Sequence, residues 1–371
     1  MFKVSIVKCD SYEYEKVYES IKKSIDLIGG LEQFNLSNKK VLLKPNLLNS
    51  KPIEKAVTTH PLIIKAVSSL VKKVSGNPII GDKPGYESLN KVLEKTGIKQ
   101  ICEIPYVDFK EFVSVSCKNG FFKEHLIAQE VLNSPFIINL PKIKTHTHMK
   151  LTLSIKNLFG CVTPPKRIDW HLKTGIHKEH FATMLVELYE LIKPQLTIVD
   201  GVIGMEGDGP SSGDPKKIGL IIAGTNGHSV DRVISEILGI GKNLYTLQAA
   251  LKKGIKGINL DEIEIVGENI ESVKIHNFKF PDTEQSDIGV IIPAFLKIPL
   301  KKFFTSKPVI IEKLCKKCKV CLENCPPHAI TEYKKKLQIN YSVCIKCFCC
   351  QEFCPYDAIK IKKGLLDRLK F

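Results

Sequence analysis

Two cysteine runs near the C-terminus have a spacing that suits iron–sulfur chemistry. The first is Cys315-x2-Cys318-x2-Cys321-x3-Cys325-Pro, and Cys344-x2-Cys347-x2-Cys350-x3-Cys354-Pro repeats it 29 residues later. Short gaps wrap three thiolates around one part of a cubane, while a fourth sulfur reaches it from further along the chain. Eight thiolates in this order therefore predict two [4Fe-4S] clusters and, with them, electron transfer.

The two runs form an internal duplication, because the same offset also carries Pro326 onto Pro355 and Ala329 onto Ala358. The segment resembles a bacterial two-[4Fe-4S] ferredoxin over about 55 residues. This resemblance implies that the fourth cysteine of each run serves the other cluster. One cluster would then use Cys315, Cys318, Cys321 and Cys354, and the other Cys344, Cys347, Cys350 and Cys325.

Zinc is the alternative metal for paired cysteines. A zinc ribbon needs only two CxxC pairs, and eight cysteines in this order overfill a single tetrahedral site. Cys349 lies inside the second run but fits no ligand position, so we expect it to be a small apolar thiol packed beside the cluster.

Composition indicates a globular protein of two or three domains. The chain has 371 residues, 43% of them hydrophobic, and no run approaches 18 apolar residues. We expect no transmembrane segment and a cytoplasmic location, where 13 cysteines favour metal sites over disulfides. Oxygen-labile clusters suggest an anaerobic host. The net charge of +16 is spread along the chain without a nucleic-acid motif, so no nucleic-acid partner is expected.

The first 285 residues alternate strand-like apolar runs with amphipathic helical stretches. This alternation predicts an α/β domain with a mostly parallel, doubly wound sheet. In residues 286–311 the alternation of strands and helices stops and prolines are frequent, which favours a connector. Residues 312–371 are expected to form a small α+β dicluster ferredoxin-like domain. The expected helices are 61–74, 88–96 and 180–193, and the expected strands lie at 41–43, 78–80, 136–138, 196–199 and 218–222.

Polar clusters follow most of the expected strands. In a parallel sheet the loops after the strands emerge together at the carboxyl edge, where ligands bind. We therefore expect one crevice to gather these segments, which are residues 44–46, 81–85, 139–146, 200–208 and 224–228.

Several of these segments carry a family resemblance. The runs LLKPN at 42–46, THP at 59–61, NLPKIKTH at 139–146, SIKNLFG at 154–160 and VDGVIGMEGDGP at 199–210 resemble the domain-of-unknown-function 362 family. Members often carry a C-terminal dicluster ferredoxin module, as this chain does. The resemblance implies that the loops form one site, but it implies no activity.

The residues of the expected crevice suggest an anion site. Lysine ammonium groups at strand ends suit a phosphate or carboxylate, although in so lysine-rich a chain each could simply be solvated. The candidates for binding a ligand or cofactor are Lys44, Asn46, Lys142 and Lys156.

A divalent metal is the second candidate for the crevice. Asp200, Glu206 and Asp208 could hold a hard cation such as magnesium, although turn-forming Asp and Gly explain this stretch as well. His146 or Lys144 would supply protons, with Asp200 orienting the substrate. No GxGxxG follows a strand, so a flavin would be loosely bound.

Three functions fit these features. The first is a redox enzyme in which the two clusters pass electrons to an anionic small molecule or cofactor in the α/β domain. The second is an electron carrier or adaptor for a partner oxidoreductase, and the third is a ligand sensor or an assembly factor for another metal centre. The expected partners are a redox partner protein and an anionic small molecule.

Overall fold

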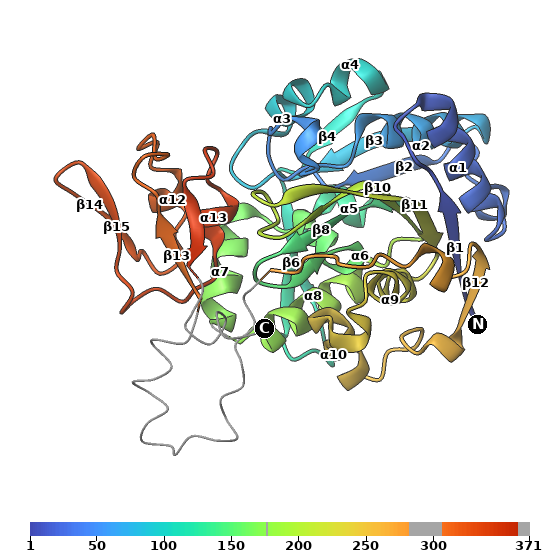
Figure 1. Ribbon diagram of the computed structural model, residues 1–371. Coiled ribbons are helices and arrows are strands. Elements are labelled where there is room, and N and C mark those ends of the chain that lie inside the picture. Colours follow the sequence, from blue (N-terminus) through green and yellow to red (C-terminus); the bar gives the residue numbers. More distant parts are fainter. Residues whose placement is uncertain (176, 282–305, 363–371) are drawn as a thin grey trace.

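The computed structural model describes residues 1–175, 177–281 and 306–362 (Figure 1). A large α/β part is followed by a small cysteine-rich part on one side of the molecule. Of the expected connector, residues 286–305 lie outside the described residues, as do residues 363–371 of the expected small domain. Strand β13 (Lys307–Ile310) pairs with β16 (Ile359–Lys362), so residues 307–310 are part of the small domain.

A ten-stranded sheet organises the α/β part. Its strands are β1 (Phe2–Lys8), β2 (Lys40–Pro45), β3 (Asn77–Asp82), β4 (Tyr106–Asp108), β7 (Phe136–Leu140), β8 (Lys142–His146), β9 (Lys150–Thr152), β10 (Leu196–Glu206), β11 (Asp214–Gly224) and β12 (Ile263–Gly267). The order is β12-β1-β11-β10-β7-β2-β3-β4, with β8 beside β10 and β9 beside β8. Most pairs are parallel, but β11 runs antiparallel to β1 and β10, and β9 to β8. A separate hairpin joins β5 (Phe112–Ser116) and β6 (Glu124–Ala128).

Helices cover both faces of the sheet. One face carries α1 (Tyr14–Asp26), α2 (Pro61–Lys73), α3 (Leu89–Lys95) and α4 (Ile98–Cys102). The other carries α5 (Gln129–Leu132), α6 (Ser154–Asn157), α7 (Pro164–Thr174), α8 (Lys178–Ile192), α9 (Gly227–Ile237) and α10 (Tyr245–Lys252). Along β2, Val41 and Leu43 pack into the first core and Leu42 into the second, because successive side chains of a strand point to opposite faces. The expected doubly wound α/β architecture is confirmed.

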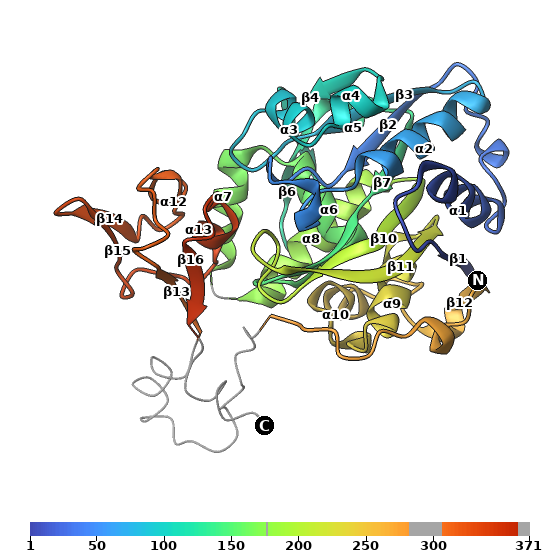
Figure 2. The same ribbon diagram turned by 45° about the horizontal axis from the view of Figure 1, so that its top comes forward.

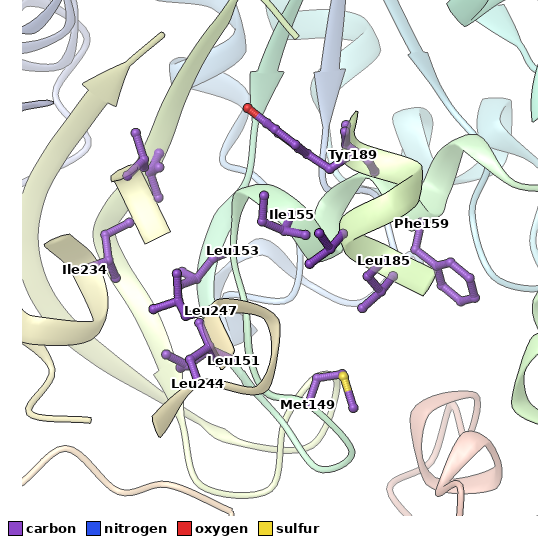
Figure 3. Packing of buried hydrophobic residues seen from close by; sticks show 14 of the residues in the cluster. Met149, Leu151, Leu153, Ile155, Phe159, Leu185, Tyr189, Ile234, Leu244 and Leu247 are labelled. Carbon is purple, nitrogen blue, oxygen red and sulfur yellow. The ribbon is translucent and has the colours of Figure 1, made fainter. Parts of the chain in front are cut away.

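The second core contains Leu153 and Ile155, which lie at the start of α6. Figure 3 shows Leu153 and Ile155 among the side chains of α8, α9 and α10, including Leu185, Ile234 and Leu247. Burying such aliphatic side chains contributes about 1.5–3 kcal/mol each. This packing fixes the backbone of α6 and therefore the direction of its polar side chains.

The expected helices form with recognisable ends. Helix α2 starts at Pro61, where the missing N–H costs nothing, and His60 caps it by accepting the Leu62 N–H at Nδ1, 3.2 Å away. The Ser88 hydroxyl caps α3 by accepting the Lys91 N–H at 3.3 Å.

Two expectations about the crevice are wrong. Because β11 is antiparallel to β10, residues 224–228 leave the sheet at the edge opposite to the carboxyl ends of its parallel strands. Residues 200–206 continue β10 instead of forming a loop. A Cβ on Gly201 would lie 2.8 Å from Ile143 Cδ1, and one on Gly204 would lie 2.8 Å from the Ile143 carbonyl oxygen. These glycines therefore admit the neighbouring strand β8 and not a ligand.

The small domain is built from two short sheets and two helical turns. Strands β13 and β16 form one pair, and β14 (Ile330–Tyr333) and β15 (Lys336–Ile339) form the other. The turns are α12 (Val320–Glu323), which follows the first cysteine loop, and α13 (Cys349–Glu352), which follows the second. In both views α13 lies toward α7 of the large part, while α12 and the β14–β15 hairpin lie on the outer side (Figures 1 and 2).

Candidate functional site

A pocket lies between the carboxyl edge of the sheet and helix α13. Its empty space is about 660 Å³ when the open solvent at its mouth is included. From the large part it is lined by the end of β2, by β8, by α6 and by α7, and from the small domain by Cys349, Glu352 and Phe353. Five of the residues expected at the site line it: Lys44, Asn46, Lys144, His146 and Lys156.

Lys44 enters the pocket with its charge already balanced. Its Nζ lies 2.8 Å from Asp82 Oδ1, and both side chains are buried. Asp82 also accepts the Leu47 and Lys83 N–H groups. A Cβ on Gly160 would lie only 2.8 Å from Lys44 Nζ, so glycine is required beside this pair. Lys44 therefore shapes the pocket more than it attracts an anion.

Lys156, unlike Lys44, has no carboxylate that balances its charge among the described residues. It makes no ion pair with any residue that the structure describes, and its Nζ lies over the rings of Phe159, 4.6 Å from the centroid, and Phe181, 6.0 Å away. Burial lowers its pKa to about 8, although the charge of Glu352 acts in the opposite direction. A largely buried ammonium group without a carboxylate partner is a site that a bound anion would stabilise.

Lys144 is the second cation of the pocket without an ion-pair partner among the described residues. It is 1% exposed, and its Nζ donates to the Val57 carbonyl oxygen at 2.7 Å. Burial lowers its pKa to about 7, with nearby Lys156 and Lys142 adding to the effect. Near neutral pH this group can therefore both hold and release a proton.

The backbone fixes the tautomer of His146. Nδ1 accepts the N–H groups of His148 at 3.1 Å and Met149 at 3.3 Å, so the ring proton is on Nε2. Nε2 makes no hydrogen bond within the described residues and lies 3.8 Å from Glu352 Oε2. Burial, together with the charge of Lys156, lowers the pKa of His146 well below its usual range, so the ring is neutral and offers an N–H donor.

A chain of amides lies beside Lys44. Asn46 Nδ2 donates to Asn157 Oδ1 at 2.9 Å, and Asn157 Nδ2 donates to Asn139 Oδ1 at 2.8 Å. Asn46 Oδ1 is buried and has no hydrogen-bond partner among the described residues, which leaves one acceptor for a ligand. Asn157 lies in the SIKNLFG run, but only the fold shows that it orients Asn46.

Four expected site residues do not line the pocket. Lys142 Nζ donates to Asp200 Oδ2 at 2.9 Å and to the Tyr12 hydroxyl at 2.6 Å, and Asp200 also accepts the His60 N–H. Glu206 accepts the Lys279 N–H, and the Asp208 carbonyl oxygen accepts from Gln351. Asp200, Glu206 and Asp208 do not form a group that could share one metal ion.

The group that could share one metal ion, among the residues described, is Cys117, His125 and Glu187, away from the pocket. There Lys253 Nζ already binds Glu187 Oε1 at 2.8 Å.

The buried pair Lys142 and Asp200 supports a prediction about stability. In the Lys142→Met variant the carboxylate of Asp200, which is 0% exposed, is left without a cation. We therefore expect the α/β part to lose about 3 kcal/mol of stability. In the double variant Lys142→Met/Asp200→Leu only part of it should return, because the unpaired carboxylate is gone but the His60 N–H still lacks its acceptor. Urea unfolding followed by circular dichroism tests this, with exposed Lys72→Met as the control. Equal unfolding midpoints for Lys142→Met and the native protein would contradict it.

The cysteines of the small domain are arranged to suit the expected clusters. Cys315, Cys318, Cys321 and Cys354 line one cavity, so the structure brings a fourth-position cysteine of the second run beside three of the first. Cys325 Sγ accepts the Ala329 N–H at 3.2 Å, and Cys354 Sγ accepts the Ala358 N–H at 3.3 Å. Such N–H···S bonds stabilise thiolate ligands, and none of these sulfurs is in a disulfide.

The second cysteine run borders the pocket. Cys349, 2% exposed, lines it, and its thiol hydrogen bond lowers the pKa of Cys347. Sequence reasoning missed Glu352 and Phe353, because nothing in the motif shows which side of α13 meets the large part. Gln351 fixes that side by donating to the Asp208 carbonyl oxygen at 2.8 Å and accepting from Thr147 at 2.9 Å.

Comparison with protein families decides the classification. Residues 41–236 match the domain of unknown function DUF362, and residues 307–355 match a 4Fe-4S dicluster domain. The chain belongs to the DUF362 family. A relative of this DUF362 protein is the thylakoid-associated protein of Synechocystis sp., 32% identical over 308 residues that cover 81% of this chain and 94% of the relative. The chain is thus an iron–sulfur protein by its C-terminal domain.

Two solved structures are similar to the DUF362 protein in part. The lactate racemase apoprotein from Thermoanaerobacterium thermosaccharolyticum has a TM-score of 0.41 and 11% identity, covering 61% of this chain and 54% of the racemase. A protein from Thermotoga maritima has a TM-score of 0.38 and 12% identity, covering 67% and 61%. Among residues 1–175, 177–281 and 306–362, no helix combines the length and apolar character that crossing a membrane requires.

Proposed function

We propose that this DUF362 protein is a redox enzyme that reduces an anionic small molecule in the pocket between its two parts. The observation that carries the proposal is the position of α13. This single turn holds Cys350, an expected cluster ligand, and contributes Cys349 and Glu352 to the pocket wall. A ligand in the pocket would therefore lie against the loop that binds a cluster.

The [4Fe-4S] clusters, when bound, supply one-electron transfer. The chain contributes the surroundings. Buried Cys347, Cys349 and Cys350 keep water away from the side of the loop that faces the pocket. Phe353 closes the rim by its edge contact with Tyr86, whose ring centroid is 5.9 Å away.

The charges around the pocket favour an anion. Within the described part of the chain, Lys144 and Lys156 have no carboxylate partner in ion-pair contact, whereas Lys44 is paired with Asp82. Arg167 also lines the pocket, but its guanidinium donates to the carbonyl oxygens of Lys83, Pro84, Val162 and Gly160. The two lysines are thus the groups that bind the carboxylate or phosphate of the substrate.

The same two lysines supply the protons that the reduction consumes. Reduction of the ligand by two electrons consumes two protons, and two equivalents of a one-electron protein donor are oxidised. Lys144 and Lys156, with pKa values lowered by burial to about 7 and about 8, supply these protons and regain them from solvent. His146 donates its Nε2–H to an oxygen of the ligand and so orients it.

A cytoplasmic location is part of the proposal. It is supported by the thirteen cysteines, all within the described residues, since none of them is in a disulfide, as expected in a reducing compartment. The expected redox partner protein is the source of electrons.

Anaerobic purification followed by mass spectrometry of the retained small molecules tests the proposed function. We expect one anionic compound to co-purify with the native protein and to be absent from the Lys144→Met/Lys156→Met variant. If neither protein retains an anion, and the native protein binds none of a panel of carboxylates and phosphates, the proposal fails.

Anion binding should depend on pH with a definite sign. Both lysines must be protonated to bind an anion, and their pKa values in the free protein are lowered to about 7 and about 8. Affinity should therefore be highest below pH 7 and fall about tenfold or more as the pH rises to 9. Calorimetry with sulfate, whose charge is constant over this range, measures the effect. An affinity that stays constant or increases with pH would contradict it.

A further inference from the structure

The two halves of the cysteine duplication have diverged at specific positions. The 29-residue offset aligns Lys316 with Ile345 and Lys319 with Phe348, while the cysteine ligands are unchanged. It also aligns Leu322 with Gln351, the residue that fastens α13 to the large part. The positions at which the halves differ therefore include a contact with the large part.

The two cysteine loops also differ in their exposure to solvent. Residues 316–319 of the first loop are all exposed, including the expected ligand Cys318. In the second loop the equivalent Cys347 is buried, and Phe348 is only 5% exposed. One cluster position thus lies against the pocket, and the other lies behind a loop that faces solvent.

The exposed loop carries positive charge that the described chain does not neutralise. Lys313, Lys316 and Lys317 make no ion pair with a residue in the described ranges, whereas Lys319 pairs with Glu332 at 2.7 Å. Two exposed apolar side chains adjoin them, Leu314 at 43% and Tyr356 at 47%, and Tyr356 lines the same cavity as Cys318. An apolar centre within a charged rim is the usual anatomy of a transient protein interface.

We infer that residues 313–319 together with Tyr356, here named the docking face, bind a small electron-carrier protein with an acidic surface around its redox centre. The inference rests on the proposed function and adds the partner and its place. The carrier is oxidised by one electron at each encounter, and that electron reduces the cluster held in part by Cys318. Positive charge at the docking face steers the acidic carrier toward the exposed ligand.

A protein carrier suits the docking face better than an anionic membrane. The lysines surround the exposed cluster ligand, which is where an electron donor must come close, whereas a lipid headgroup delivers no electron.

The test compares two charge reversals that change the net charge equally. Lys316→Glu/Lys317→Glu alters the docking face, and Lys334→Glu/Lys335→Glu alters the outer turn between β14 and β15. The probe is an acidic flavodoxin, used oxidised for the dissociation constant by calorimetry and reduced for the rate of cluster reduction by stopped flow. Dithionite, a small reductant, controls for cluster integrity.

We expect the docking-face variant to bind flavodoxin about tenfold or more weakly and to be reduced correspondingly more slowly, with weaker dependence on salt. The outer-turn variant should behave as the native protein, and dithionite should reduce all three alike. Equal effects in both variants, or none, would overturn the inference. So would loss of binding to phosphatidylserine vesicles without any change toward flavodoxin. If flavodoxin reduces the clusters but no pocket ligand is converted, the proposed function fails while this inference stands.

Discussion

Replacing Cys354 with serine is expected to remove one cluster and to lower bound iron from about eight to about four atoms per chain. The physical reason is geometric. Cys354 lines one cavity with Cys315, Cys318 and Cys321, although it comes from the second run. Loss of its thiolate leaves three sulfurs, and the N–H of Ala358, which donates to Cys354 Sγ, loses its acceptor.

Paired variants show which cysteines belong together. Cys321→Ser/Cys354→Ser should keep about four irons, because both changes affect one cluster, whereas Cys321→Ser/Cys325→Ser should lose nearly all eight. Cys349→Ser should keep all eight, since Cys349 occupies no ligand position of the motif. Iron and sulfide analysis of anaerobically reconstituted protein, with electron paramagnetic resonance, measures these outcomes. The reverse pattern in the two double variants would show that each run ligates its own cluster.

The second large effect concerns the two lysines of the pocket. We expect Lys144→Met/Lys156→Met to weaken sulfate binding about a thousandfold, because each ammonium group forms a charge-assisted contact away from water worth about 2 kcal/mol or more. Methionine keeps much of the aliphatic stem, so packing against Phe159 and Phe181 is preserved. The variant also removes two buried positive charges, so its stability should not fall.

Calorimetry at pH 6.5 measures this loss directly. Lys72→Met, on the exposed side of α2, is the control and should bind sulfate as the native protein does. Each single variant should lose about thirtyfold, and the sulfate affinity of the double variant should no longer depend on pH. Affinity within about threefold of the native value in the double variant would show that the anion binds elsewhere.

The sequence was sufficient for the fold class because its signals are local, whereas it did not show that β11 runs antiparallel to β10. Apolar runs predict buried strands at Val41 to Leu43 and at Ile218 to Ile222. Pro61 and Ser88 likewise indicate where two helices begin. The cysteine spacing likewise indicates the cofactor without any tertiary information. These features depend on residues close together in the chain.

The candidate site could be predicted only in part because its remaining properties depend on distant partners. Lys44, Lys142, Lys144 and Lys156 look alike in sequence, yet Asp82 neutralises the first and Asp200 the second. The contribution of α13 could not be seen either, since it depends on Gln351 meeting Thr147 and the Asp208 carbonyl oxygen. Gly201 and Gly204 resemble part of a ligand loop but serve the close approach of β8.

In the proposed function, electrons taken up by the C-terminal domain reach a ligand in the pocket. Rapid-freeze electron paramagnetic resonance of the reduced protein, mixed without oxygen with the small molecule that co-purifies, tests it most directly. We expect the cluster signals to disappear as the ligand is reduced, two electrons per molecule, and to persist in Lys144→Met/Lys156→Met. Clusters of the native protein that stay reduced beside a bound but unchanged ligand would contradict it.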